Sequence, residues 1–205
     1  MKKYNSTLSI AGTCVIIFII QSIIPSLTNI LALKSSYFLK EPWTLITSIF
    51  SHVSLVHLLQ NMFALILFGI ILEHLIGTKK FLLNYFIAGL VSGIVSIFFY
   101  NSVIGASGAI MGIIGCLAII KPKMQMWILG MPMPMYLATG LYLVIDLFGI
   151  LMPSNVANIS HIAGLVSGII FGFIIKDKDV KVNKDDDIKM YVSEEELRKW
   201  EDKNM

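Results

Sequence analysis

Charged side chains are scarce in this 205-residue chain, at 14% of the residues, and they are unevenly placed. Residues 1–176 hold nine lysines and three acids, whereas residues 177–205 hold ten acids and seven basic residues. A soluble domain of this size needs more polar surface than the first 176 residues supply. The chain also lacks basic residues clustered on one face, which argues against a nucleic-acid partner.

Cysteine is scarce as well, with only Cys14 and Cys116, and both lie in apolar runs. We expect them to be small core hydrophobes and not a disulfide or a metal-binding pair. A metal site built on His52, His57 and His161 is a weak alternative, because no acidic or cysteine ligand lies near these histidines in the sequence.

Apolar residues are abundant instead, at 56% of the chain, with a mean hydropathy of +0.79. Apolar runs of about twenty residues cross a bilayer as helices. The sequence predicts six such spans, at about residues 8–27, 54–72, 81–100, 105–120, 132–150 and 157–175. The expected fold is therefore an all-α membrane protein with six transmembrane helices.

The lysines indicate how this bundle is oriented. Most of them fall on one side of a six-span topology, so the positive-inside rule places both termini in the cytoplasm. Residues 1–176 are expected to form one domain, followed by a charged cytoplasmic tail at residues 177–205. Ser193 and Glu196 form a capping box in that tail, which predicts a short helix there.

Among the polar side chains within the apolar runs, four matter for function: His57, Asn61, Ser107 and His161. At about 1.5 Å per residue, they lie roughly 18–24 Å above the inner end of their spans. In a hydrocarbon layer about 30 Å thick, this level is roughly 6–12 Å below the outer surface. Polar groups inside a membrane are costly and usually functional. Three helices thus bring polar groups to one depth.

The fourth run is too short to cross the bilayer, so its helix is expected to begin below the outer surface, with Ser107 at its start. The unpaired N–H groups of that helix start need protein or water around them. Glycines at residues 108 and 112 face a stripe at residues 164, 168 and 172, which predicts close packing of the fourth and sixth runs. Such packing brings the Ser107 hydroxyl within reach of the His161 imidazole.

A serine hydroxyl becomes a nucleophile when a histidine takes its proton, and the resulting oxyanion needs hydrogen-bond donors. The Ser107 backbone, the Asn61 amide and the His57 ring are candidate donors. Asp146 is fifteen residues from His161 in the sequence, which counts against a triad and favours a Ser–His dyad. The alternative is that Ser107 only packs helices together.

Three stretches resemble a rhomboid intramembrane serine protease. They are SHVSLVHLLQNM, with the pattern His-x4-His-x3-Asn; GASG, the GxSG motif with Gly105 and Gly108; and HIAGLVSG, which holds Gly164 and Gly168. The resemblance covers residues 8–175. It implies that Ser107 is the nucleophile, that His161 is the general base, and that His57 and Asn61 are oxyanion donors. It also implies that His52 ties down the outer loop.

The resemblance further implies cleavage of single-pass membrane proteins in or near the outer end of their transmembrane helix, without metal or other cofactor. The segment DLFGILMPSNVANIS would gate the entry of substrate and water. The small core indicates a bacterial inner (plasma) membrane. Two positions depart from the family's usual pattern. Thr44 stands where many members carry arginine, and Met111 stands where many carry an aromatic residue that stacks on the base.

Two other functions stay open. A catalytically inactive rhomboid-like protein would bind membrane proteins without cleaving them, although such relatives usually lack the serine or the histidine. A channel or transporter is a second rival. No inverted repeat is detectable in the sequence, and the polar groups cluster near one membrane face, which disfavours a transport path.

Overall fold

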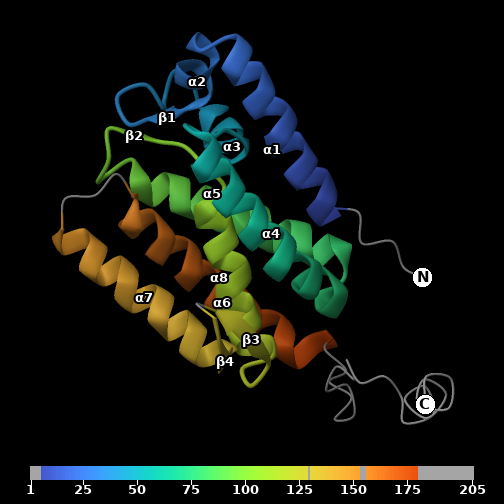
Figure 1. Ribbon diagram of the computed structural model, residues 1–205. Coiled ribbons are helices and arrows are strands. Elements are labelled where there is room, and N and C mark those ends of the chain that lie inside the picture. Colours follow the sequence, from blue (N-terminus) through green and yellow to red (C-terminus); the bar gives the residue numbers. More distant parts are fainter. Residues whose placement is uncertain (1–5, 129, 153–155, 180–205) are drawn as a thin grey trace, which may run out of the picture.

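The protein is mostly helical in a computed structural model that describes residues 6–128, 130–152 and 156–179 (Figure 1). Its long helices are α1 (Ser6–Ile23), α4 (Leu55–Ile76), α5 (Thr78–Ser96), α6 (Ser107–Ile120), α7 (Met135–Leu151) and α8 (Asn158–Asp179). Three short helical segments connect α1 to α4, namely α2 (Ser26–Leu31), α3 (Thr44–Thr47) and the 3-10 helix η1 (Ser48–Phe50). The helix predicted in the tail lies outside the described residues.

Two short strand pairs correct the all-α prediction. Strand β1 (Leu33–Lys34) pairs antiparallel with β2 (Ser102–Val103), and β3 (Gln125–Ile128) pairs antiparallel with β4 (Met131–Pro134). The β3–β4 pair holds prolines that cannot continue a helix, which explains its extended backbone. The β1–β2 pair is of more interest for function, because it joins the loop after α2 to the loop that leads into α6.

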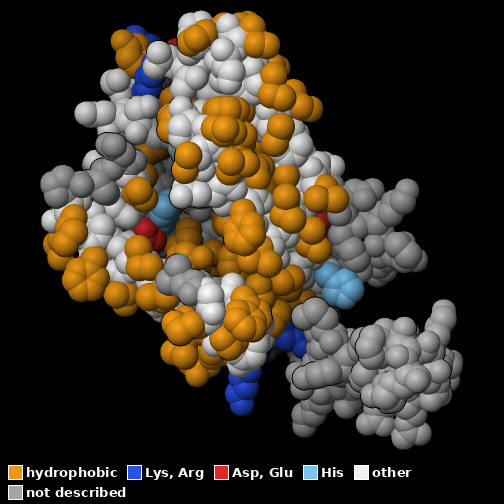
Figure 2. All heavy atoms as spheres, in the orientation of Figure 1, with side chains coloured by type: hydrophobic (Ala, Val, Ile, Leu, Met, Phe, Trp, Pro, Cys, Tyr) orange, Lys and Arg blue, Asp and Glu red, His pale blue; other side chains and the backbone are white. Residues whose placement is uncertain are grey.

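Three helices, α1, α4 and α8, are long and apolar enough to cross a membrane, while α6 and α7 are apolar but shorter. Hydrophobic side chains cover most of the face shown in Figure 2, and lysine side chains lie at the top and bottom of that view. Together with the three long apolar helices, this exposed apolar surface is that of a membrane protein. The six-span count and the side on which the termini lie stay predictions.

Helix α6 lies at the centre of the molecule, between α5, α4 and α8 (Figure 1). The glycines on α6 and α8 explain how closely these two helices approach. A Cβ atom added at Gly164 would overlap the carbonyl oxygen of Gly108, and one added at Gly168 would overlap that of Gly112. The two backbones therefore touch, as the glycine stripes predict.

A buried carboxylate near the C-terminal end of α4 joins this helix to α1. Glu73 accepts hydrogen bonds from the backbone N–H of Ser6 and from both the N–H and the hydroxyl of Thr7. It also accepts one from the hydroxyl of Thr78, at the start of α5. Glu73 thus supplies the N-terminus of α1 with the acceptors that a helix start needs.

Candidate active site

Ser107 is the first residue of α6 and follows a sharp turn. Gly105, two residues earlier, has a φ of 127°, a backbone conformation that favours glycine. Its N–H donates to the carbonyl of Ser48 at 2.8 Å, which fixes the turn to η1. No side chain of the described residues caps the start of α6, so the first N–H groups of this helix are available to another acceptor near Ser107.

His161 lies in the first turn of α8 and is within hydrogen-bond distance of Ser107. The Nε2 atom of His161 is 2.7 Å from the Oγ atom of Ser107. The two residues are 54 positions apart in the sequence, and the glycine contact between α6 and α8 brings them together. The histidine side chain is 18% exposed, so the pair is accessible but largely enclosed.

Asp146 on α7 contacts the other nitrogen of the same ring. Its Oδ1 atom is 3.0 Å from the Nδ1 atom of His161, and its side chain is 6% exposed. From the sequence, the distance along the chain counted against this contact, and that expectation is wrong. Helices α7 and α8 are consecutive and pack together, so residues far apart in the sequence meet near the connection between them.

His57 and Asn61 lie one turn apart on α4, near the turn before Ser107. A Cβ atom at Gly105 would be 2.8 Å from the Nε2 atom of His57, so the imidazole lies against the backbone of this turn. The amide nitrogen of Asn61 donates to the carbonyl of His57 at 2.8 Å. The Nδ1 atom of His57 and the Oδ1 atom of Asn61 are buried without a hydrogen-bond partner among the described residues.

His52 is buried directly behind His57. The two rings meet edge to face, with their centroids 5.1 Å apart. The backbone N–H and carbonyl of His52 are both hydrogen-bonded to the side-chain amide of Gln21 on α1. Burial, followed by repulsion from His57, lowers the pKa of His52 to about 4, so this ring is neutral at neutral pH. Both ring nitrogens of His52 are buried without a hydrogen-bond partner among the described residues, so its role in tying down the outer loop stays a prediction.

The two positions that depart from the family's usual pattern are both buried. Met111 is 5% exposed and belongs to the hydrophobic core, one turn after Ser107. Thr44 is 1% exposed, and its hydroxyl donates to the carbonyl of Glu41 at 2.6 Å. The neighbouring Trp43 is half exposed. Thr44 therefore closes the turn at the start of α3 without an arginine.

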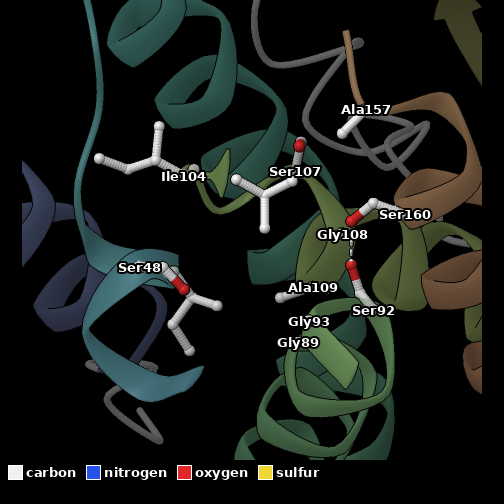
Figure 3. A pocket seen from close by; sticks show the side chains of 13 residues that line it. Ser48, Gly89, Ser92, Gly93, Ile104, Ser107, Gly108, Ala109, Ala157 and Ser160 are labelled. Atoms are coloured by element: carbon white, nitrogen blue, oxygen red, sulfur yellow. Dashed lines mark hydrogen bonds between the residues drawn. The ribbon is translucent and has the colours of Figure 1, made fainter. Parts of the chain in front are cut away.

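A small cavity of about 30 Å³ lies beside Ser107, between η1, α5 and the start of α8 (Figure 3). Its wall holds the hydroxyls of Ser92 and Ser160, which point toward each other and are 2.5 Å apart. A polar cavity of this volume has room for a water molecule. Among the described residues, no three His, Cys, Asp or Glu side chains are grouped as a metal site.

Three further residues near the site were not predicted from the sequence. Gln21 holds the backbone of His52, Ser92 pairs with Ser160, and the hydroxyl of Tyr100 accepts a hydrogen bond from the N–H of Ile159 in the first turn of α8. All three are polar residues within or next to predicted apolar spans, which is the one signal that could have found them.

A family model for the rhomboid domain matches residues 39–178. The chain belongs to the rhomboid family. It is 35% identical over 137 residues to RHOMBOID-like protein 6, mitochondrial, of Arabidopsis thaliana, covering 66% of this chain and 44% of that protein. It is 37% identical over 136 residues to Rhomboid protease GluP of Bacillus subtilis, covering 62% and 25%.

A third rhomboid relative is matched over most of its length. The chain is 30% identical over 139 residues to Rhomboid protease GlpG of Haemophilus influenzae, covering 65% of this chain and 70% of that protein. By contrast, the chain spans less than half the length of the Arabidopsis proteins RHOMBOID-like 6, 1 and 4. Ser107, His161, His57 and Asn61 all lie within the segment that the family model matches.

Proposed function

We propose that this rhomboid is an intramembrane serine protease with Ser107 as its nucleophile and His161 as its general base. The observation that carries the proposal is the 2.7 Å distance between Ser107 Oγ and His161 Nε2. Family membership supports it, since two of the relatives are named rhomboid proteases. The reaction needs no metal ion or other cofactor, because the two side chains supply the nucleophile and the base.

In this mechanism the Ser107 hydroxyl attacks the carbonyl carbon of the substrate while its proton passes to His161 Nε2. The carbonyl oxygen becomes an oxyanion, for which the N–H groups at the start of α6 and the side chains of His57 and Asn61 are the candidate donors. His161 then gives its proton to the leaving amine, which leaves an acyl group on Ser107. A water molecule then attacks that ester while His161 takes its proton. His161 returns the proton to Ser107 Oγ as the acid product leaves.

The proposed substrates are single-pass membrane proteins that are cut in or near the outer end of their transmembrane helix. The exposed apolar surface favours a substrate that arrives through the bilayer (Figure 2). Helix α7 and the segment after it are the proposed gate, because many α7 side chains are exposed on the apolar surface. We further propose six membrane spans, cytoplasmic termini and a bacterial inner membrane.

Covalent labelling tests this function directly. The purified protein in detergent is treated with a fluorescent fluorophosphonate, which reacts with an activated serine. Wild type is expected to label, and Ser107→Ala and His161→Ala are expected to lose labelling. Ser22→Ala is the matched control, because this serine on α1 is exposed and its hydroxyl donates to the Phe18 carbonyl of the same helix. Cleavage of a single-helix test substrate in liposomes should follow the same pattern.

The rival function is an inactive rhomboid that binds membrane proteins. It would be favoured if folded wild type neither labels nor cleaves the test substrate. The GASG motif would then serve only to pack α6 against its neighbours, as its glycines do in any case.

A further inference from the structure

Asp146 is a buried carboxylate on an otherwise apolar helix. It is one of four residues of α7 that are buried, and the other three are Met135, Ala138 and Thr139. A carboxylate in an apolar bundle is costly unless a donor satisfies it. Its hydrogen-bond partner is the Nδ1 atom of His161, at 3.0 Å. The position of this acid is therefore best explained by the ring that it contacts.

We infer that Asp146 is a positioning residue that holds the His161 ring in its working tautomer and orientation. This inference rests on the proposed protease function. A carboxylate only accepts hydrogen bonds, so Nδ1 must carry the ring proton. The Nε2 atom is then left as an acceptor, and it faces the Ser107 hydroxyl at 2.7 Å. The three side chains form one chain of hydrogen bonds from Asp146 to Ser107.

Proton transfer to His161 during the reaction gives Asp146 a second role. When the bond between Ser107 Oγ and the substrate carbon forms, the hydroxyl proton moves to Nε2 and the imidazole becomes a cation. The carboxylate of Asp146, 3.0 Å from Nδ1, stabilises this cation and takes no proton itself. When the peptide C–N bond breaks, the proton leaves Nε2 with the amine. The ring is then neutral again, with its Nδ1 proton still bonded to Asp146.

A merely structural role would have different consequences. In that case the contact would only fasten α7 to α8, and its loss would change how easily a substrate helix enters. A small fluorophosphonate needs no such entry of a helix, so its reaction rate reports on the state of Ser107 and His161 alone. The two roles are thus separated by comparing the small probe with a transmembrane substrate.

The test compares Asp146→Asn with the control Thr139→Val in the full chain. Thr139 lies two turns earlier on α7, is buried like Asp146, and has no hydrogen-bond partner for its hydroxyl among the described residues. Asparagine keeps the size of aspartate, but its amide also donates hydrogen bonds and carries no charge. We expect Asp146→Asn to slow labelling and lower kcat by at least about tenfold, with KM unchanged. Thr139→Val should match wild type, and Asp146→Glu should restore part of the rate.

Two results would overturn the inference while leaving the protease function intact. One is an Asp146→Asn variant that labels at the wild-type rate. The other is a change confined to KM for the transmembrane substrate, which would identify a fastening contact. Wild type that neither labels nor cleaves would instead refute the protease function, and the inference with it.

A spectroscopic measurement checks the tautomer without relying on activity. The chain has four histidines, so 15N-histidine NMR gives few signals, and His161→Gln assigns the one of interest. We expect the neutral ring to carry its proton on Nδ1 in wild type and to populate both tautomers in Asp146→Asn. A wild-type ring with its proton on Nε2 would contradict the inference, whatever the activity.

Discussion

Helices α6 and α7 both contribute to the site, but α6 is almost entirely buried and α7 is mostly exposed. Twelve of the fourteen residues of α6 are buried, whereas four of the seventeen residues of α7 are. Helix α6 packs on α8 through glycines that leave no room for a methyl group. Helix α7 exposes large apolar side chains, among them Phe148 and Leu151, at 60% and 80%.

This difference separates the proposed reacting pair from the residue that orients it. Ser107 and His161 lie on the two helices whose backbones touch, so their 2.7 Å contact is part of a rigid scaffold. Asp146 lies on the peripheral helix. A displacement of α7 would therefore change the orientation of His161 without separating α6 from α8. If α7 is also the gate, opening it would remove the orienting carboxylate from the base.

The largest expected effect is on the α6–α8 contact. In Gly168→Ala the new Cβ would overlap the backbone of Gly112, and backbone atoms on both sides cannot move aside. We expect a loss of about 3 kcal/mol in the free energy of unfolding. For a chain of this size that corresponds to a Tm lower by about 6–12 °C. Thermal unfolding in detergent, followed by circular dichroism, measures it.

The matched control for this variant lies on α7. A Cβ at Gly140 would meet no atom within 4 Å. Replacing a helix glycine by alanine in open space stabilises the helix by about 0.5–1 kcal/mol. Gly140→Ala should therefore leave Tm unchanged or raise it. Equal losses of Tm in the two variants would mean that α6 and α7 are packed alike, contrary to their burial.

A smaller effect is expected where the C-terminal end of α7 meets the start of α8. A Cβ at Gly149 would lie 2.6 Å from both amide atoms of the Asn158 side chain. Gly149 is three residues after Asp146, and Asn158 is three residues before His161. We therefore expect Gly149→Ala to displace Asp146 relative to His161. We expect fluorophosphonate labelling to slow by about threefold to thirtyfold.

The stability of this variant serves as its internal check. Because α7 is peripheral, the Tm of Gly149→Ala should fall less than that of Gly168→Ala. Labelling at the wild-type rate would show that the Asn158 side chain simply turns away, and that the position of α7 does not govern the base. Gly140→Ala is again the control, with labelling expected to match wild type.

Much of this architecture could be predicted from the sequence, for physical reasons that differ between elements. The glycine stripes on α6 and α8 specify one close contact, and that contact is enough to bring Ser107 and His161 together. Asp146 could not be placed in this way, because no pattern on α7 fixes which of its faces meets α8. The strand pair β1–β2 was missed because two-residue strands carry no periodicity.

The smallest effect concerns the buried residue one turn after Ser107. Met111 belongs to the hydrophobic core of the α6–α8 region, where methionine adapts its shape to its neighbours. If Asp146 orients the His161 ring through its 3.0 Å contact with Nδ1, an aromatic residue at position 111 is not needed to hold that ring. We expect Met111→Tyr to leave the labelling rate within about threefold of wild type, or to raise it, because the Asp146 contact already fixes the imidazole. The same labelling assay measures it, and a hundredfold loss would mean that packing around Met111 controls the base and not the carboxylate on α7.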